Sequence, residues 1–541
     1  MVEVNAKNIV LEWVRGWTEG DISGRIGQIL GIIKLFFVVP LLRISLYICF
    51  LMSLFLSLEW VHLMVLSVLV KLFWKTPHKR FKFQEIEDDL ECGNEAFPFV
   101  LVQIPVANEI EVYKLSIGAA SKLSWPADRL WIQVLDDSSD QANKDMIQKE
   151  CSRWANEGIN IWYHARETRE GFKAGALKQG MEQDYAKQCK YVAIFDVDFQ
   201  PEPDFLRRAI PFLVHNPELG LVQARWRFVN ADTCMFTRLQ EMSLDFHFTF
   251  EQEVGSSAFG FFGFNGSGGI WRIDAINEAG GWDCATTTED LDLAVRAALK
   301  GWKFLYLGEL QVKSELPSTF KAYRSQQYRW SCGPSNLFRT RFIQIATNKK
   351  MSPGLKLYMI FNFFFVRKIT CHTIIFLSYC VISPLTILIP EVDNPKAKAV
   401  FVPLLIAALN TIVATPRSLY LILHWILLEI SMSFHRTKAI FAGLFRARSA
   451  NEWVVTRKFG DSLLNNKINI DSTESKYHEV RSNVQTDRFL LPELGIAMVL
   501  LTCGCYGFVY GKEYYYFVFV FFQAIFFTIA GFSYFGLQNL D

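Results

Sequence analysis

Two carboxylates separated by one residue close an apolar run near the middle of the chain. The run occupies residues 191–195 (YVAIF), and Asp196 and Asp198 follow it directly. Residues i and i+2 of an extended segment point to the same side, so we expect the two carboxylates to converge on one spot. Two bare carboxylates there would repel each other unless a divalent cation lay between them, and oxygen ligands favour Mn²⁺ or Mg²⁺. The simpler alternative is that these aspartates only cap the next helix.

A further acidic motif opens a predicted helix. Residues 286–302 (TTTEDLDLAVRAALKGW) carry an apolar stripe at helical spacing, and Thr286 and Glu289 have the spacing of a capping box. Glu289 and Asp290 then fall in the first turn, where the helix dipole favours negative charge. Capping alone would explain them. The functional interpretation is that Asp290 is a general base held at the mouth of a site.

An aromatic and basic motif precedes the second apolar part of the chain. In 326–339 (QQYRWSCGPSNLFR), Arg329 can pair with a phosphate, and Trp330 offers a flat face on which a sugar ring can stack. Aromatic and basic residues also anchor proteins at membrane surfaces. Both interpretations stay open at this point.

These motifs lie in a stretch that alternates strand and helix patterns. The spacing at 109–123 predicts a helix, and four apolar runs predict strands, at 98–106, within 130–140, at 160–165 and from 191. This order predicts an α/β domain with a mainly parallel, Rossmann-like sheet covered by helices on both faces. Such sheets bind ligands beyond the carboxyl ends of their strands, where Asp136 and Asp137 end the second predicted strand.

The chain as a whole is strongly apolar, and long apolar runs lie on both sides of this stretch. Of 541 residues 51% are hydrophobic, and 47 Phe are present, which is typical of proteins that meet lipid. Several apolar runs approach the length of about 20 residues that crosses a bilayer, too long for most buried core helices. They lie at 35–56, 369–390, 400–434, 489–510 and 513–536, and a shorter run at 60–74 is either a second span or an interfacial helix. The sequence predicts a multi-pass membrane protein with a globular insert.

Charge and cysteine usage exclude some classes of protein. The net charge is +2, which gives no indication of nucleic acid as a partner. The 11 Cys form no CxxC pair and predict no disulfide framework.

We expect the chain to have four parts: an N-terminal segment without a secretory signal (1–33), a membrane helix or helix pair (34–74), the α/β domain (75–345), and interfacial and membrane helices (346–541).

The basic residues near the span ends predict an orientation. The segments 75–82 and 435–448 are rich in Lys and Arg, whereas the short loop 391–396 is poorer, so the insert and the 435–488 loop should face the cytosol. The glycosylation sequon Asn265-Gly266-Ser267 lies inside the insert and would be open to modification in a lumen. Neither argument decides, and a luminal placement stays open.

Taken in order, the motifs resemble those of the processive family 2 glycosyltransferases, the group of the cellulose, chitin and hyaluronan synthases. The matching motifs are Asp136-Asp137, Asp196-Val197-Asp198, Thr288-Glu289-Asp290 and the QxxRW of 326–330. The stretch 451–461 (NEWVVTRKFGD) resembles the FxVTxK gating loop of that group, with Trp453 where Phe is usual.

A closer resemblance is to the plant cellulose synthase-like A proteins, the β-mannan and glucomannan synthases. It extends over most of the chain, through stretches such as 171–181 (GFKAGALKQGM) and 262–272 (FGFNGSGGIWR). That group usually has DAD where this chain has DVD (196–198), and QQHRW where this chain has QQYRW (326–330). The differences are at Val197 and Tyr328, and neither alters a carboxylate, the Arg or the Trp. The resemblance implies a GT-A glycosyltransferase domain between transmembrane helices, in the Golgi membrane.

The resemblance also implies a role for each matched residue. Asp290 would be the base that deprotonates the acceptor's 4-hydroxyl in an inverting displacement, and Asp196 and Asp198 would hold Mn²⁺ or Mg²⁺ on the diphosphate. The nucleotide and donor would be contacted by Asp136, Asp137, Asn108, Glu109, Lys173, Gln326 and Arg329. The acceptor would rest on Trp330, Phe264, Asn265, Gly266 and Ser267, and the gating loop would include Val455, Thr456 and Lys458.

The implied activity is polymerisation of mannan or glucomannan from GDP-mannose, with GDP-glucose as a second donor. Implied partners are the growing polysaccharide, membrane lipid, and an accessory protein or a second copy of the chain. The product must leave through the membrane, and Arg43 either lines that path or reaches to the interface. Three alternatives stay open: a UDP-glucose-dependent β-glucan synthase, a catalytically silent subunit, and a transporter. Intact carboxylates argue against the second, and the large insert against the third.

Overall fold

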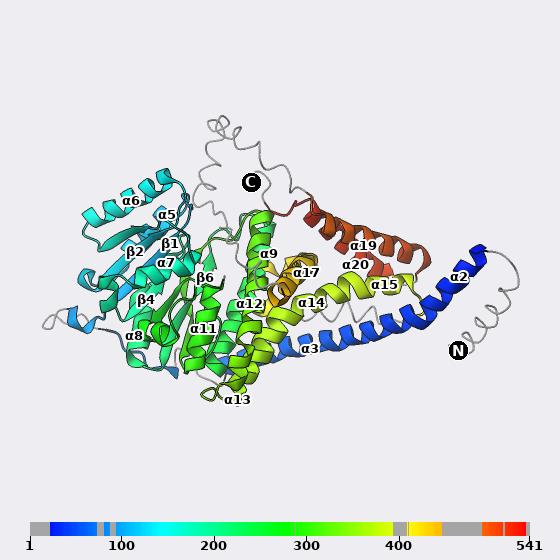
Figure 1. Ribbon diagram of the computed structural model, residues 1–541, viewed down its shortest axis with the longest axis horizontal. Coiled ribbons are helices and arrows are strands. Elements are labelled where there is room, and N and C mark those ends of the chain that lie inside the picture. The colour runs from blue at the N-terminus through cyan, green and yellow to red at the C-terminus, as the bar shows by residue number, and fades with distance from the viewer. Residues whose placement is uncertain are drawn as a thin grey trace.

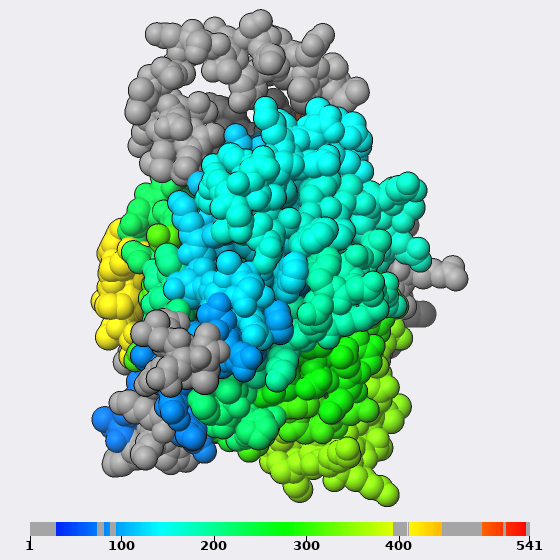
Figure 2. Space-filling view, turned by 90° about the vertical axis from the view of Figure 1, so that its left-hand side faces the viewer, coloured from blue at the N-terminus to red at the C-terminus, as the bar shows by residue number. Residues whose placement is uncertain are grey.

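The computed structural model describes residues 22–72, 80–86, 94–286, 288–392, 408, 411–445, 489–511 and 514–536. An α/β domain forms one end of the molecule and long helices form the other (Figure 1). The helix α12 (Phe320–Thr347) lies between these two parts. Figure 2 views the domain from the side opposite the helices, and the domain's own residues form most of that face.

The domain is built on an eight-stranded sheet within the described residues. The order is β3-β2-β1-β4-β7-β6-β8-β5. The run β3-β2-β1-β4 and the pair β6-β8 are parallel, whereas β7 is antiparallel to both neighbours and β5 is antiparallel to β8. The bounds are β1 (Val100–Val106), β2 (Leu130–Asp136), β3 (Ile161–Ala165), β4 (Tyr191–Ile194), β5 (Gln200–Pro201), β6 (Leu219–Phe228), β7 (Gly269–Arg272) and β8 (Lys303–Ser314).

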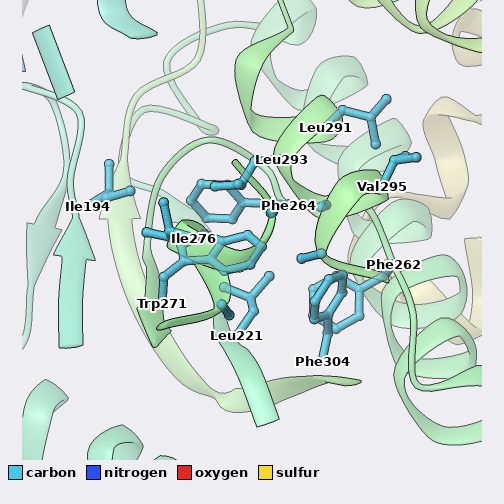
Figure 3. Close-up of a cluster of buried hydrophobic side chains, with 14 of the residues drawn as sticks. Ile194, Leu221, Phe262, Phe264, Trp271, Ile276, Leu291, Leu293, Val295 and Phe304 are labelled. Carbon is cyan, nitrogen blue, oxygen red and sulfur yellow. The ribbon is translucent and has the colours of Figure 1, made fainter. Parts of the chain in front are cut away.

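Alternate residues of the strands pack into two separate cores, one on each face of the sheet. Val100, Val102 and Ile104 of β1 join one cluster, while Leu101 joins the other. The first cluster is covered by α5 (Tyr113–Ser121), α6 (Gln141–Asn156) and α8 (Phe205–His215). The second is covered by α7 (Phe172–Met181), α10 (Ile273–Glu278) and α11 (Glu289–Lys300), and part of it is drawn in Figure 3. The predicted mainly parallel sheet with helices on both faces is confirmed.

The fourth predicted strand ends earlier than its apolar run suggests. β4 stops at Ile194, and the chain then turns, with the Phe199 N–H donating to the Asp196 carbonyl at 2.8 Å. Asp196 and Asp198 therefore lie in a turn and not in an extended segment. The i, i+2 alternation of an extended segment is therefore not what directs their carboxylates, although both side chains line the same cavity.

Four helices are long and apolar enough to cross a membrane among the residues that the structure describes. They are Ile29–Leu72, Pro353–Leu388, Pro416–Phe445 and Leu491–Tyr510, with a shorter apolar helix at Tyr516–Gly531. The first contains the run 35–56 and residues 60–72 of the shorter run, so no break separates a helix pair within the described residues. The elements are α2 (Ile22–Ile33), η1 (Lys34–Val38), α3 (Val39–Leu72), α13 (Pro353–Leu357), η7 (Tyr358–Thr370), α14 (Cys371–Phe376), η8 (Leu377–Ile382), α15 (Ser383–Leu388), η9 (Pro416–Leu421), α17 (Ile422–Phe445), α19 (Leu491–Tyr510) and α20 (Tyr514–Gly531).

Polar side chains near the end of α9 (Met235–Phe246) link the domain to the membrane helices. Its Asp245 pairs with Arg225 of β6 at 2.6 Å and accepts from the Thr415 hydroxyl at 2.7 Å. Two residues earlier, the Ser243 hydroxyl lies 3.1 Å from Glu429 of α17. The π-helices η5 (His247–Gln252) and η6 (Gly255–Phe259) continue α9, and the short turns η2 (Asn94–Ala96), η3 (Ala127–Arg129) and η4 (Asp184–Gln188) lie elsewhere in the domain.

Candidate active site

A cavity of about 200 Å³ opens beyond the carboxyl ends of β1, β2 and β4, and we call it the sheet-edge cavity. This is the place where parallel sheets bind ligands. It gathers most of the residues singled out in the sequence, namely Glu109, Asp137, Lys173, Asp196, Asp198, Asn265, Gly266, Asp290, Gln326, Arg329 and Trp330.

Asp196 and Asp198 both line this cavity, although the turn holds them differently. The Asp196 N–H donates to the Ser267 hydroxyl at 2.8 Å, and its carboxylate accepts from Lys173 Nζ at 2.5 Å. The Asp198 carboxylate accepts from the Ser314 hydroxyl at 3.0 Å. The helix that follows is capped at Asp204, so neither aspartate is a simple helix cap.

The donor set suits a hard divalent cation that takes part of its shell from a ligand. Two carboxylates face one cavity, yet the described residues contain no group of three or more His, Cys, Asp or Glu side chains able to hold a metal. Mg²⁺ and Mn²⁺ commonly bind one or two carboxylates and complete their coordination with water and substrate phosphates. Asp196 and Asp198 fit that kind of site.

Lys173 connects the turn that carries Asp196 to the loop that contains Gly266. Its Nζ donates to Asp196 and also to the Gly266 carbonyl, at 2.9 Å. Burial lowers the pKa of Lys173, but the carboxylates of Asp196, Glu289 and Asp290 outweigh this and raise it, so the side chain is charged.

Gly266 allows the loop to approach Asp290 closely. Its φ is +84°, and a Cβ there would lie 2.8 Å from Asp290 Oδ2. Both the left-handed backbone and the lack of space therefore require glycine.

Asp290 lies in the first turn of α11, as the sequence predicts, but the predicted capping box is wrong. The N-cap is Thr288, whose side chain makes no capping bond, and the Thr286 hydroxyl accepts from the Thr288 N–H at 3.2 Å. The Asp290 carboxylate accepts from the Leu291 N–H at 2.7 Å.

Glu289 is a site residue to which the sequence interpretation gave only a helix-capping role. It is 3% exposed, and burial together with the neighbouring Asp290 carboxylate raises the pKa of Glu289 to about 8. Burial also raises the pKa of Asp290, while Lys173 opposes the shift. The adjacent pair of acids is the signal that would have pointed to Glu289, since two carboxyls so close in a buried turn cannot both ionise easily.

The helix α12 presents the QxxRW motif to the cavity. Gln326, Arg329 and Trp330 are separated by three and four residues, so they share one face of the helix. Burial lowers the pKa of Arg329, and the carboxylates of Glu289 and Asp196 oppose this. Trp330 keeps 39% of its surface exposed, so its ring is available to a ligand.

The two acidic residues at the end of β2 lie in different environments. Asp137 lines the cavity and is held by two bonds from Arg166, at 2.7 and 3.0 Å. Burial raises the pKa of Asp137, and Arg166 opposes the shift. Asp136, in contrast, is fully buried, does not line the cavity, and accepts from the Tyr163 hydroxyl and the Ser138 N–H, both at 2.8 Å. The expected contact of Asp136 with a nucleotide is not supported by this placement.

Two further predicted residues support the cavity without lining it. Asn108 has a φ of +64° and ties the loop after β1 to the loop after β2, accepting from the Ser139 N–H at 2.9 Å. Ser267 is buried and holds the Asp196 backbone.

The loop before Lys173 was also overlooked as part of the site. Arg169 and Phe172 line the cavity, and Phe172 has a φ of +46°, an uncommon conformation for a bulky residue. The preceding Gly171 is left-handed as well, and a Cβ there would lie 2.7 Å from Cys284.

A second cavity, of about 450 Å³, adjoins the first and runs between the helices. We call it the helix cavity; α3, α9, α12, η7, α14 and α17 contribute to its wall, which extends to Phe519. The two cavities share Trp226, Leu244, Asn265, Thr288, Asp290, Gln326 and Trp330.

Phe264 and Arg43 are placed differently from the expectation. Phe264 lines only the helix cavity, is 3% exposed, and packs edge-on against Trp271 with ring centroids 5.6 Å apart (Figure 3). Arg43 is exposed, lines neither cavity, and donates to the Glu391 carbonyl at 2.6 Å. Val455, Thr456 and Lys458, with the rest of 451–461, lie outside the described residues.

Comparisons with known proteins agree with this architecture. The family model for glycosyl transferase family 2 matches residues 102–267, and that for glycosyl transferase family group 2 matches residues 191–428. The chain is 58% identical over 516 residues to glucomannan 4-beta-mannosyltransferase 2 of Arabidopsis thaliana, covering 95% of this chain and 96% of that protein.

A second relative and a solved structure are also similar to this chain. The chain is 55% identical over 500 residues to glucomannan 4-beta-mannosyltransferase 1 of Oryza sativa subsp. japonica, covering 92% of this chain and 95% of that protein. Among solved structures it is similar to mannosyltransferase PcManGT from Pyrobaculum calidifontis, in complex with GDP-Man and Mn²⁺, at 16% identity and a TM-score of 0.46 over 72% of this chain and 99% of that one. That structural likeness is too distant to bear on the site.

Proposed function

Because the chain belongs to the family of the glucomannan 4-beta-mannosyltransferases, we propose that it extends a mannan or glucomannan chain with mannosyl units from GDP-mannose, and accepts GDP-glucose as a second donor. The family that the sequence motifs resemble is thereby confirmed, as is its GT-A fold. The observation that carries the proposal is the sheet-edge cavity, where the carboxylates of three motifs meet the arginine and tryptophan of the fourth.

The nucleotide side of the cavity holds the donor. Asp137 and Glu109 face the base and ribose, while Arg329, Lys173 and Gln326 approach the diphosphate and the leaving group. Asn108 and Asp136 act behind them, since they brace the two loops instead of facing the cavity. Asp196 and Asp198 hold Mn²⁺ or Mg²⁺, which when bound supplies charge neutralisation for the departing diphosphate.

Asp290 is the base for the acceptor. It lies on the wall shared by both cavities, so it can reach a hydroxyl that enters from the helix cavity while the donor occupies the sheet-edge cavity. The base removes the proton of the acceptor's 4-hydroxyl as that oxygen attacks the anomeric carbon and GDP leaves, with inversion. A positioned base contributes about 10²- to 10⁴-fold to such a step.

The acceptor end lies against Trp330, with Asn265 and Gly266 beside it. Trp330 supplies the flat apolar face, whereas Phe264 and Ser267 support the loop from beneath. The helix cavity is the path of the product, because it starts at Asp290 and runs between helices apolar enough to span a membrane.

The protein is a multi-pass membrane protein, and we assign its catalytic domain to the cytosolic face of the Golgi membrane. The basic flanks support the cytosolic side. The segment 451–461, with Val455, Thr456 and Lys458, would close over bound nucleotide, and an accessory protein or a second copy would complete the assembly.

The test uses detergent-solubilised full-length protein with Mn²⁺ or Mg²⁺ and labelled GDP-mannose, GDP-glucose or UDP-glucose, each offered alone. We expect polymer from GDP-mannose that an endo-β-mannanase degrades, and none from Asp290→Asn. Polymer from UDP-glucose alone would instead make the protein a glucan synthase. Absence of polymer from every donor, with an active relative as positive control, would support a silent subunit.

A further inference from the structure

A network of polar side chains lies directly behind the acceptor side of the site. It consists of His247, Glu251 and Gln252 of η5, and it ends on Asn265. His247 Nδ1 lies 2.6 Å from Glu251 Oε2, and His247 Nε2 lies 3.1 Å from Asn265 Oδ1. A π-helix brings residue i+5 close beneath residue i, as well as i+4, so His247 contacts both Glu251 and Gln252, whose Nε2 lies 3.0 Å from His247 Nε2.

The network fixes which way the Asn265 amide points. Gln252 Nε2 lies 3.1 Å from the Gly263 carbonyl, which can only accept, so the Gln252 amide must turn its NH₂ group that way. The same NH₂ group lies 3.0 Å from Asn265 and therefore meets the oxygen Oδ1 of that amide. The Asn265 nitrogen is left as the free end.

That nitrogen has no hydrogen-bond partner within the described part of the chain, although it is buried. A buried donor without a partner is costly unless a ligand or water supplies an acceptor. Asn265 lines both cavities, and its neighbour Gly266 lies against Asp290. The unpaired donor is thus beside the point where the acceptor hydroxyl must be held.

Glu251 makes the histidine a rigid support. It is flanked by the cationic side chains of Arg367 and Lys368 on η7, and all three line the helix cavity together with His247. Burial raises the pKa of Glu251, but the His247 hydrogen bond and these two cations outweigh it, so the pKa is lowered. As an anion, Glu251 accepts the Nδ1 proton, which leaves Nε2 as an acceptor. The Gln252 NH₂ group lies 3.0 Å from this Nε2 and donates to it, so His247 acts on Asn265 through Gln252.

On the basis of the proposed function, we propose that Glu251, His247 and Gln252 are positioning residues that orient the Asn265 amide so that its Nδ2 donates to a hydroxyl oxygen of the acceptor's terminal sugar. The network acts on the acceptor and not on the donor. It thereby sets how the acceptor's 4-hydroxyl is presented to Asp290.

Two isosteric variants of His247 separate this role from general packing. The amide of His247→Gln reaches the place of Nε2, and its oxygen can still accept from the Gln252 NH₂ group, whereas that of His247→Asn reaches only the place of Nδ1. With GDP-mannose and a β-1,4-manno-oligosaccharide, we expect kcat/KM for the acceptor to fall roughly 10- to 100-fold in His247→Asn, and about 3-fold or less in His247→Gln. KM for GDP-mannose should be unchanged in both, and Thr249→Ala on the same π-helix is the control.

A double-mutant cycle tests whether His247 acts through Asn265. In an Asn265→Ala background, His247→Asn should cost nothing further, because the amide that it orients is gone. Equal losses in His247→Gln and His247→Asn, multiplicative losses in the cycle, or a matching rise in donor KM would each overturn the proposal. Lack of any transfer by the wild-type protein would instead show that the proposed function itself is wrong.

Discussion

The sheet-edge cavity and the helix cavity share a wall but differ in charge: acidic residues are in excess in the first and are matched by basic residues in the second. Seven acidic residues line the sheet-edge cavity (Glu109, Asp137, Asp196, Asp198, Glu289, Asp290 and Glu315), against the three basic residues Arg169, Lys173 and Arg329. In the helix cavity three acidic residues (Glu251, Asp290 and Glu429) meet three basic ones (Arg367, Lys368 and Arg436).

This difference in charge indicates which kind of ligand each cavity can bind. An excess of carboxylates repels an anionic diphosphate, so the sheet-edge cavity can bind a nucleotide sugar only with cations beside it. The balanced helix cavity, with Trp60, Trp330 and Trp425 in its wall, suits an uncharged sugar chain. Asp290 belongs to both cavities, as a residue that links donor to acceptor should.

The largest effect is expected at this shared residue. Asp290→Asn should lower the polymerisation rate about 10²- to 10⁴-fold, because the amide cannot take the acceptor's proton. Binding of GDP-mannose, measured by isothermal titration calorimetry, should persist. A variant that loses donor binding as severely as catalysis would assign Asp290 to the sheet-edge cavity alone.

Removal of divalent cations should come next. Chelation should reduce polymer formation at least roughly 100-fold, and added Mn²⁺ or Mg²⁺ should restore it, because the acidic cavity cannot hold a diphosphate without them. Asp198→Asn should shift the metal concentration needed for half-maximal rate upward. Full activity in the presence of chelator would contradict the interpretation of the charge excess.

A smaller effect is expected on the acceptor side. Trp330→Ala should raise KM for a manno-oligosaccharide about 10-fold by removing the stacking face. Trp330→Phe keeps a flat ring and should recover most of the loss. If KM for GDP-mannose rose instead, Trp330 would belong to the donor.

The contact between α12 and α17, two helices that contribute to the helix cavity, offers a test through packing. A Cβ on Gly443 of α17 would lie 2.2 Å from the Cys332 carbonyl of α12, so Gly443→Ala should force these helices apart and destabilise the protein by about 1–3 kcal/mol. Gly495→Ala is a matched control, because nothing lies within 4 Å of the added methyl. Thermal unfolding in detergent should separate the two variants, and equal midpoints would show that the α12–α17 contact is loose.

The smallest expected effect is on how the stability of the protein, free of metal and donor, depends on pH through Glu289. Its folded pKa of about 8 lies above the ordinary value of 4.5, so the folded state holds a proton that the unfolded chain has lost. Stability therefore falls as pH rises from about 4.5 to 8. Glu289→Gln removes this loss, and its unfolding midpoint should decline less than the wild type's between pH 6 and 9. Parallel declines would contradict the raised pKa.

The sequence predicted the parts of the fold whose apolar pattern is local. β1 to β4 are short apolar runs ending in polar loops, and their order implies parallel pairing. β6, β7 and β8 were not predicted, since β7 is only Gly269–Arg272 and pairs antiparallel between two strands distant in sequence. Such pairing depends on tertiary contacts that no local period reveals.

Within the site, the sequence predicted which residues would gather but not how each is held. Asp136 and Asp137 look equivalent as neighbours, yet one is directed into the domain toward Tyr163 and the other toward Arg166. Glu251 and His247 could not be recognised, because a π-helical turn looks like an ordinary helix in sequence. Their i, i+4 spacing is compatible with either.

The first membrane helix is longer than the thickness of a bilayer's hydrocarbon core. At 1.5 Å per residue, the 44 residues Ile29–Leu72 extend about 66 Å, roughly twice the 30 Å thickness of a hydrocarbon core. Even at a tilt of about 40°, the upper end of the usual range, only some 26 residues fit inside. About 18 residues must therefore project past the lipid tails, and the ion pairs Lys34–Glu391 and Glu59–Arg367 mark two heights at which this rod is held to its neighbours.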